Sequence, residues 1–314
     1  MIQIPVIDLS KALSGDKQAR NEVAAEIDQA CREIGFITIK GHGIDKAIFD
    51  DVYASLNAFY ALPQTQKAQC TTDVRPCHHQ VNGYSALLAE NAHRLMGKEG
   101  LPSDYLEKFS MGRSLLDDDF DLPFPDHPTC IELRANMKRY YEACLDLTKM
   151  LTELFAIALD LPEDYFADKV DDSWDYLRLH HYPARPPEMN HDQGFAEHAD
   201  MVFMTILTNV QDGLEVLTKE GDWVKAQTSQ LDQFIVNIGD CMQRWSNDEW
   251  VSTIHRVTLT KTERQSIIFF KTVNENTLIE TFPKFRKNGK SKYQPISFEN
   301  YVGELAAKLF GKKE

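Results

Sequence analysis

Three residues in the second half of the chain have the types and spacing of a metal site. His198 and Asp200 are two positions apart in GFAEHADMVFMTIL, at the start of an apolar segment that favours a β-strand. Side chains at positions i and i+2 of a strand point to the same face, so this imidazole and carboxylate can converge. A single His-x-Asp occurs often by chance, but His255 in STIHRV provides a third ligand from another predicted strand.

The combination of two histidines with one carboxylate narrows the choice of metal. It is the facial triad that binds Fe(II) in non-haem oxygenases. Three protein ligands leave three coordination positions open, two for a chelating co-substrate and one for O₂. A zinc hydrolase could use the same three residues, but it would have no obvious use for the pair described next.

Arg264 and Ser266 form a second polar pair, in the segment ERQSIIFF. They are also at positions i and i+2 of a predicted strand and therefore share a face. A guanidinium beside a hydroxyl is a receptor for a carboxylate, because the two-pronged guanidinium provides both strength and orientation. Arg-x-Ser alone has little specificity as a motif. Here Arg264 follows the predicted metal ligand His255 by nine residues, and this position makes a role in the same site more specific.

The elements that position these residues follow from hydrophobic periodicity. The pattern predicts strands at 4–9 and 36–43, and helices at 17–34, 44–62 and 129–160. After Pro162, short segments rich in β-branched and aromatic residues alternate with turns, which favours a sandwich or barrel. The last helix is predicted over 297–314, with Ser297 as its N-cap.

Residues 64–127 lack clear periodicity and are rich in polar, Gly and Pro positions. A segment of this length without regular structure is often functional. We predict a loop-rich cover with a hairpin around EKFSMG, at 107–112. We expect 75–115 to become ordered when substrate binds, because closure would exclude water from the site.

The sequence resembles the plant and microbial 2-oxoglutarate/Fe(II) dioxygenases, a family that includes isopenicillin N synthase and anthocyanidin synthase. The resemblance covers roughly residues 4–310, and its motifs occur in family order: IPVIDLS, GFITIKGHGI, HHYPARPPE, EHADMVFMTIL, VNIGD, STIHRVT and ERQSIIFF. It implies an α+β fold with a double-stranded β-helix (jelly-roll) core, N-terminal helices packed outside and a C-terminal helix. The chain 1–314 would be one domain, with a mainly helical part at 1–161, the β-core at 162–296 and a helix at 297–314.

The resemblance also assigns roles to the site residues. It implies that His198, Asp200 and His255 bind Fe(II). It implies that Arg264, Ser266 and Tyr182 of the HYP motif hold the distal carboxylate of 2-oxoglutarate. The expected reaction uses O₂ to oxidise a C–H bond of a small, specialised metabolite by hydroxylation, desaturation or cyclisation.

Two alternatives remain open at this point. The step from His255 to Arg264 and the string ERQS are similar to isopenicillin N synthase, an oxidase that uses no 2-oxoglutarate and whose Arg and Ser bind a substrate carboxylate. That enzyme has a glutamine near its C-terminus, whereas this chain ends in LFGKKE. The other alternative is a catalytically inactive binding protein on the same scaffold, which the intact ligand set disfavours.

Several other polar residues near these motifs have simpler interpretations. His180, His181 and His191 are expected to be pocket walls or solvated side chains, and His42 is expected to serve the fold. Arg256 should point away from His255. Candidate pocket residues are Arg178, Gln243 and Trp245.

Composition excludes several function classes. The chain of 314 residues has a net charge of −14, so a nucleic-acid partner is not expected. The N-terminus lacks a secretory signal, and no apolar run approaches the roughly 18 residues of a membrane span. The six cysteines include no CxxC pair, which predicts reduced thiols and a cytoplasmic location. The expected partner is a small-molecule substrate, and the oligomeric state is left open.

Overall fold

The computed structural model describes residues 3–71, 83–98, 100–116 and 126–310, and its β-core consists of two facing sheets. The larger sheet has the order β1 (Val6–Asp8), β2 (Phe36–Lys40), β10 (Phe234–Ile238), β7 (Met204–Thr208), β12 (Arg264–Lys271), β5 (Tyr176–Tyr182), β4 (Glu107–Gly112) and β3 (Gly83–Ser85). The smaller sheet has the order β6 (Gln193–His198), β11 (His255–Thr258), β8 (Leu214–Leu217) and β9 (Trp223–Lys225). All pairs in both sheets are antiparallel except β1 with β2.

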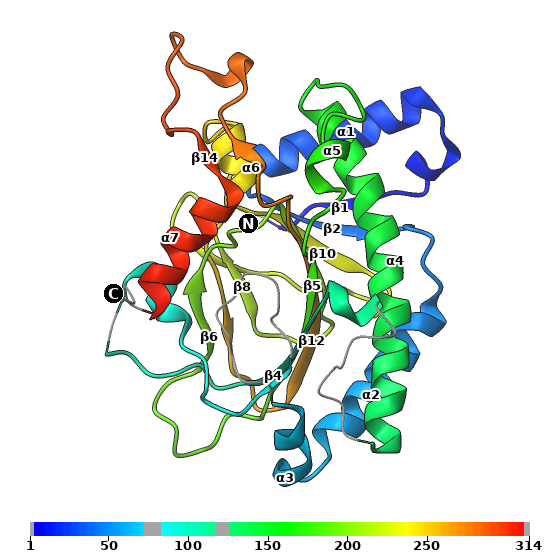
Figure 1. The fold of residues 1–314 in the computed structure, drawn as a ribbon, viewed down its shortest axis with the longest axis vertical. Coiled ribbons are helices and arrows are strands. Elements are labelled where there is room, and N and C mark those ends of the chain that lie inside the picture. Colours follow the sequence, from blue (N-terminus) through cyan, green and yellow to red (C-terminus); the bar gives the residue numbers. More distant parts are fainter. Residues whose placement is uncertain (1–2, 72–82, 99, 117–125, 311–314) are drawn as a thin grey trace.

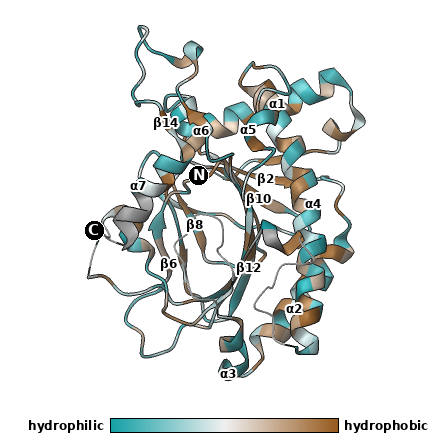
Figure 2. Ribbon diagram, viewed as in Figure 1, coloured by the Kyte–Doolittle hydropathy of each residue, from teal (hydrophilic) through white to brown (hydrophobic). Residues whose placement is uncertain are grey.

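The alternation of side chains along each strand divides the core into two layers. On β12, Ile267 and Phe269 belong to the larger hydrophobic cluster, which also contains the helices, whereas Ile268 and Phe270 belong to the cluster between the two sheets. The even-numbered positions of β12 therefore face the barrel interior. Figure 2 shows hydrophobic residues along β2 and β10 and a more hydrophilic β6.

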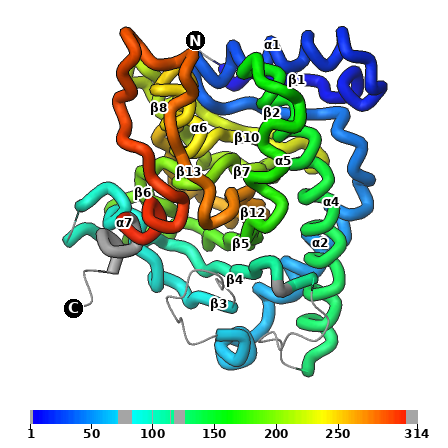
Figure 3. Tube along the Cα trace, turned by 45° about the horizontal axis from the view of Figure 1, so that its top comes forward, coloured from blue at the N-terminus to red at the C-terminus, as the bar shows by residue number. Residues whose placement is uncertain are grey.

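The N-terminal helices cover the outside of the larger sheet. The long helix α4 (Pro128–Ala158) packs against α1 (Lys17–Glu33) and α2 (Lys46–Tyr60), and it also contacts β12. Figures 1 and 3 show α2 and α4 along one side of the β-core and α7 (Phe298–Phe310) on the opposite side. The predicted helices at 17–34, 44–62 and 129–160 are confirmed to within two residues at each end.

Side-chain caps explain where the outer helices begin. Asp16 accepts a hydrogen bond from the backbone N–H of Gln18 at 3.0 Å, and Asp45 does the same for Ala47 at 2.9 Å. The hydroxyl of Ser297 accepts from the backbone N–H of Asn300 at 3.3 Å, which confirms the predicted N-cap.

The remaining elements are short. They are the helices α3 (Gln64–Lys67), α5 (Ala167–Val170) and α6 (Asp240–Trp245), the strands β13 (Leu278–Ile279) and β14 (Ile296–Ser297), and 3₁₀ turns at Ala12–Ser14, Ala68–Cys70, Ala92–Met96, Arg113–Leu116 and Pro283–Phe285. Within the described ranges, none of the helices combines the length and hydropathy needed to cross a membrane. The five described cysteines are free and buried, and Cys77 lies outside the described residues.

The prediction of a separate hairpin at 107–112 is wrong. This segment is the single strand β4, which pairs with β5 on one side and with the distant, three-residue β3 on the other. The larger sheet therefore continues into the region predicted as cover, and β4 contributes side chains to the barrel interior. The expected ordering of 75–115 on substrate binding stays a prediction, and 72–82, 99 and 117–125 lie outside the described residues.

Candidate metal centre

The three predicted metal ligands meet where the chain passes from the smaller sheet to the larger one. His198 is the last residue of β6 and lies directly opposite His255, the first residue of β11. Asp200 is not on a strand, in contrast to the expectation that it shares a strand face with His198. It is held instead by the crossing, where its backbone oxygen accepts from the N–H of Asp240 at 2.8 Å.

Gly239 makes this close crossing possible. A Cβ atom at Gly239 would lie 2.0 Å from the backbone oxygen of Val202 and 2.9 Å from that of Asp200. No real side chain could be accommodated at these distances without moving the backbone that carries Asp200. The Gly-Asp turn signal in VNIGD therefore corresponds to a steric requirement of the site.

The donor atoms of the three residues are close enough to share one ion. Oδ1 of Asp200 lies 3.7 Å from Nε2 of His198 and 3.9 Å from Nε2 of His255. One potential ligand atom from each residue lies within 4.8 Å of the others, and all three residues are buried. Two imidazole nitrogens and one carboxylate oxygen are the donor set that Fe(II) accepts in oxygenases.

Backbone carbonyls orient both imidazoles. The Nδ1 atom of His198 lies 2.8 Å from the oxygen of Ala196, and the Nδ1 atom of His255 lies 3.1 Å from the oxygen of Thr253. A carbonyl can only accept, so Nδ1 carries the proton in each ring. The lone pair of each Nε2 is therefore free for a metal.

Two residues that sequence analysis missed orient the carboxylate of Asp200. Its Oδ2 atom accepts from the hydroxyl of Thr205 on β7 and from the amide of Asn237 on β10, each at 2.7 Å. Oδ1 is thereby left for a metal. Asn237 interrupts the apolar strand FIVNI and is 2% exposed, so a buried polar residue was the available signal.

The electrostatics of the site favour the metal-binding protonation states. Burial and the neighbouring His255 imidazole lower the pKa of His198 to about 3, and the charge of Arg178 acts in the same direction. Burial opposes ionisation of Asp200, but His255 and His198 outweigh it and lower the pKa of that carboxyl. The isolated protein thus holds a neutral imidazole beside a carboxylate.

The predicted carboxylate receptor faces the barrel interior. Arg264 lies opposite Tyr182, and Ser266 lies opposite His180, in the pairing of β12 with β5. The guanidinium of Arg264 is 4.9 Å from the ring centroid of Tyr182, and its Nη1 donates to the hydroxyl of Ser266 at 3.4 Å. The structure therefore brings the three predicted residues together.

Arg264 has no acidic partner among the described residues. It is 3% exposed, its Nε has no hydrogen-bond partner, and no ion pair within 4.0 Å involves it. Burial lowers the pKa of Arg264, which Tyr182 and Tyr53 oppose, and burial raises the pKa of Tyr182 to about 12. A buried guanidinium in this state fits an exogenous carboxylate, because an unpaired buried charge is costly.

The structure separates the other candidates by face. Arg178 and His180 lie on the inner face of β5, whereas His181 lies on the outer face and contacts Glu107 at 2.8 Å. Trp245 packs in the outer cluster and is not interior, whereas Gln243 accepts from the N–H of Ser252 and its place in the pocket stays a prediction.

The remaining expectations concern residues outside the site. His42 bonds to the backbone of Asp232 at 2.7 Å, which confirms its structural role. Arg256 pairs with Glu215 at 2.9 Å and lies over the ring of Trp223, so it points away from the metal centre as expected. His191 accepts from the N–H of Gln193 and belongs to no metal-binding group within the described part of the chain.

Comparison with known proteins agrees with this geometry. Residues 4–129 match the family model for the non-haem dioxygenase in morphine synthesis N-terminal region, and residues 173–273 match the 2OG-Fe(II) oxygenase superfamily. The 2-oxoglutarate-dependent dioxygenase gloF of Glarea lozoyensis is 30% identical over 280 residues, which cover 82% of this chain and 84% of gloF. Isopenicillin N synthase of Streptomyces griseus is 29% identical, with 98% and 96% covered.

A solved structure shows the same fold with a bound co-substrate. A full-length Neurospora crassa protein, crystallised in complex with alpha-KG (2-oxoglutarate) and thymine, has a TM-score of 0.84 and 27% identity, with 97% of this chain and 96% of that chain covered. The predicted double-stranded β-helix is confirmed. Because gloF is named for its dependence on 2-oxoglutarate and the Neurospora crassa protein binds it, the oxidase alternative is not favoured. The chain belongs to the 2-oxoglutarate/Fe(II)-dependent dioxygenases, with Fe(II) as cofactor, 2-oxoglutarate as co-substrate and O₂ as oxidant.

Proposed function

We propose that His198, Asp200 and His255 hold the Fe(II), and that Arg264, Ser266 and Tyr182 hold the distal carboxylate of 2-oxoglutarate. One observation carries this proposal: a triad of free, buried donor atoms and a buried guanidinium without an acidic partner face the same barrel interior. Each half is unsatisfied in the protein alone, and a metal with a bound dicarboxylate would complete both.

The reaction couples 2-oxoglutarate, O₂ and a substrate C–H bond to succinate, CO₂ and the oxidised substrate. When bound, Fe(II) supplies the centre at which O₂ is reduced with electrons from 2-oxoglutarate and from that C–H bond. The protein's contribution is orientation and exclusion of water. Arg264 binds the co-substrate at its distal end, and Thr205, Asn237 and the two backbone carbonyls hold the metal ligands in position.

The substrate is a small molecule of modest size, and no nucleic acid is involved. The Neurospora crassa protein binds thymine, gloF is a dioxygenase, and a proline hydroxylase is also a relative at 30% identity. We infer that this chain oxidises a specialised metabolite by hydroxylation, desaturation or cyclisation. We further infer that residues 1–314 form a single catalytic domain that works in the cytoplasm, in agreement with the five buried free thiols.

Metal binding, co-substrate binding and succinate formation test this function. The purified chain should bind one Fe(II), or Mn(II) as a redox-inert probe, and then one 2-oxoglutarate with the weak visible band of an iron chelate. His198→Ala should abolish metal-dependent succinate formation. His191→Ala is the matched control, since His191 lies outside the ligand set, and it should leave the metal affinity unchanged.

Two results would contradict the proposal. Full turnover in rigorously iron-free protein would exclude the metal role of the triad. Oxygen uptake driven by substrate alone, with no chelate band on addition of 2-oxoglutarate, would restore the isopenicillin N synthase-like reaction.

A further inference from the structure

The inner face of β4 and β5 contains a second group of polar atoms that the proposed function does not use. Nε of Arg178, Oγ of Ser110 and Nε2 of His180 are all buried and have no hydrogen-bond partner. Ser110 and Arg178 lie directly opposite each other in the pairing of β4 with β5. Ser110 is 1% exposed and His180 is 3% exposed, so water cannot readily satisfy them.

Arg178 lies beside two aromatic rings and forms no ion pair with a described residue. Its guanidinium carbon lies 5.2 Å from the ring centroids of both Tyr176 and Phe270, which stack on each other at 4.6 Å. No ion pair within 4.0 Å and no side-chain hydrogen bond of Arg178 occurs within the described ranges. Cation–π attraction to the two rings stabilises the guanidinium in this position, and its donors are left for a ligand.

The neighbouring charges already have partners. Lys108, on the same face of β4, pairs with Glu90 at 2.7 Å. The carboxyl of Asp104 accepts from the backbone N–H groups of Ala92 and Ala196, at 2.6 and 2.8 Å. The proposed function assigns Arg264 to 2-oxoglutarate. Within the described part of the chain, the guanidinium of Arg178 then remains as an interior cation without an acidic partner.

The position of Arg178 suits a substrate beside the metal rather than a second co-substrate. It is four residues before Tyr182 on the same face of β5, about 13 Å along the strand from the 2-oxoglutarate receptor. The same face of β5 nevertheless leads to the metal centre, because the ring centroid of His180 lies 5.7 Å from that of Phe195, which lies 4.7 Å from that of His198.

We propose that Arg178 and Ser110 form the anchor for a carboxylate of the substrate, so that this enzyme oxidises a small carboxylic acid. This inference rests on the proposed function, since it assigns Arg264 to 2-oxoglutarate. A carboxylate satisfies the guanidinium with two charge-assisted hydrogen bonds and can accept the third from Ser110. A neutral carbonyl would leave the partly buried positive charge uncompensated. The stacked rings of Tyr176 and Phe270 offer an apolar surface to the remainder of the substrate.

Matched acids and amides test this assignment. The probes are benzoate, phenylacetate, 3-phenylpropanoate and cyclohexanecarboxylate, each with its primary amide, added to full-length protein saturated with Mn(II) and 2-oxoglutarate. Calorimetry and ligand-observed NMR detect binding up to about 10 mM. We expect at least one acid to bind, and we expect the affinity for its amide to be at least about 30-fold lower.

Variants locate that preference. Arg178→Met should lower the affinity for the acid at least about 30-fold and abolish the discrimination, and Arg178→Lys should recover part of it. Arg139→Met is the matched control, because Arg139 is an exposed cation on α4, and it should behave as the wild type. Ser110→Ala should lower the affinity for the acid about 3-fold to 10-fold. This second variant keeps the test decisive if Arg178→Met fails to fold.

The proposal is overturned if acids and amides bind equally, if Arg178→Met keeps the discrimination, or if no acid binds. Its failure is distinguishable from failure of the proposed function. One 2-oxoglutarate per chain should bind to wild type and to Arg178→Met with similar affinity. If Mn(II) and 2-oxoglutarate do not bind at all, the proposed function fails, whereas the acid–amide comparison still reports on Arg178 in the metal-free protein.

Discussion

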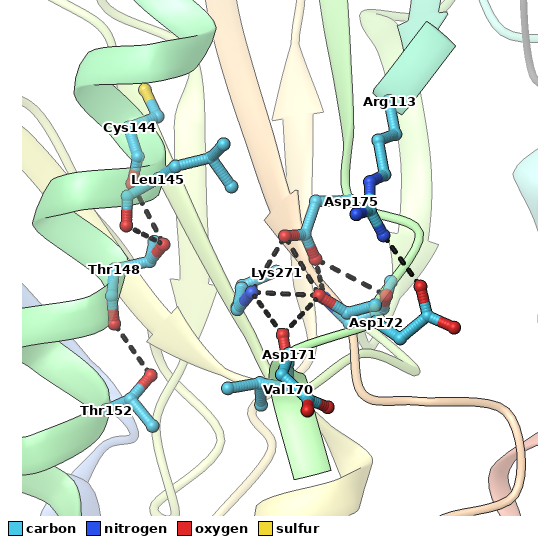
Figure 4. Close-up of polar contacts among 12 residues, drawn as sticks. Arg113, Cys144, Leu145, Thr148, Thr152, Val170, Asp171, Asp172, Asp175 and Lys271 are labelled. Atoms are coloured by element: carbon cyan, nitrogen blue, oxygen red, sulfur yellow. Dashed lines mark hydrogen bonds and ion pairs between the residues drawn. The ribbon is translucent and has the colours of Figure 1, made fainter. Parts of the chain in front are cut away.

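The charged side chains on the two faces of β5 and β12 differ in whether they have partners within the protein. On the outer face, Lys271 donates to Asp175 at 2.8 Å, to the hydroxyl of Ser173 at 2.9 Å and to the carbonyl of Val170 at 3.3 Å (Figure 4). The other carboxyl oxygen of Asp175 accepts from the N–H of Thr272 at 2.8 Å. Every donor of the ammonium thus has a partner within the protein.

The inner face of the same strands contains cations without such partners. Arg264 on β12, which is buried, and Arg178 on β5, which is partly buried, each leave Nε unbonded, and neither forms an ion pair with a described residue. Leaving a charge buried and unpaired costs free energy that a purely structural residue would not impose. The comparison teaches that satisfied buried charge belongs to the fold, whereas unsatisfied buried charge indicates a ligand.

The largest expected effect concerns the outer face. Lys271→Met leaves the carboxylate of Asp175 buried without its cation, so the free energy of unfolding should fall by about 3–5 kcal/mol. Chemical denaturation measures this change, and Lys149→Met on the exposed side of α4 is the matched control. A loss of unfolding free energy below about 1 kcal/mol would mean that a buried charge with many partners in this protein does not necessarily stabilise the fold.

The corresponding change on the inner face should behave differently. Arg264→Met removes a cation that has no acidic partner among the described residues, so the ligand-free protein should lose less than about 1 kcal/mol. Its affinity for 2-oxoglutarate should fall by about 2–5 kcal/mol, roughly 30-fold to several thousand-fold, because the distal carboxylate would be buried unpaired. Titration of the iron chelate band measures the affinity, and Fe(II) binding itself should survive.

Arg264→Lys should recover only part of that affinity, since an ammonium cannot reproduce the two-pronged contact. Equal affinity for 2-oxoglutarate in wild type and Arg264→Met would contradict the contrast between the inner and outer faces of β5 and β12. It would show that an unpartnered buried guanidinium in this barrel does not indicate a carboxylate site.

Local pattern was sufficient for most elements and for the residues that share a strand. The helices α1, α2 and α4 follow from periodicity, which depends only on neighbours in the chain. The same parity places Arg264 with Ser266. It also places Arg178, His180 and Tyr182 on one face of β5, whereas the position of Trp245 in the outer cluster depends on how α6 packs and does not follow from strand alternation.

What sequence analysis missed depends on pairing between distant strands. The partners of Asp200 come from β7 and β10. Asn237 is marked in the sequence only as a polar residue within an apolar strand, and the role of both partners follows once those strands are known to be neighbours. The strand β3 has three residues and joins the sheet only through β4, so periodicity had too little length to show it. The position of Asp200 beyond β6 likewise follows from a crossing between sheets.

Lys108 is an intermediate case, since it lies on the inner face but has one acidic partner. Burial, reinforced by Arg178, lowers the pKa of Lys108 to about 8 despite Glu90. Between about pH 8 and 10.5 the unfolded chain therefore binds more protons at this residue than the folded protein does. The free energy of unfolding should rise with pH across this window through Lys108, by up to about 3 kcal/mol.

The difference in unfolding free energy between wild type and Lys108→Met isolates this effect from other titrating groups. It should shift in favour of wild type from about pH 8 to about pH 10, whereas the difference for Lys149→Met should stay flat. A difference that does not change with pH would place Lys108 with the fully satisfied charges of the outer face.

The smallest expected effect concerns the orientation of a metal ligand, and it separates two threonines of β7. Thr205→Val removes a donor to Oδ2 of Asp200 at nearly constant volume, and Asn237 remains as the second donor. Loss of such a supporting contact typically weakens metal binding about 10-fold to 100-fold. Thr208→Val is the matched control, because that hydroxyl bonds to Tyr53 and not to Asp200. It should lower stability by about 1 kcal/mol and leave the metal affinity unchanged. Competition titration with a chelator measures both affinities. If the two variants lose metal affinity equally, the carboxylate is not oriented by Thr205, and general softening of β7 explains the loss.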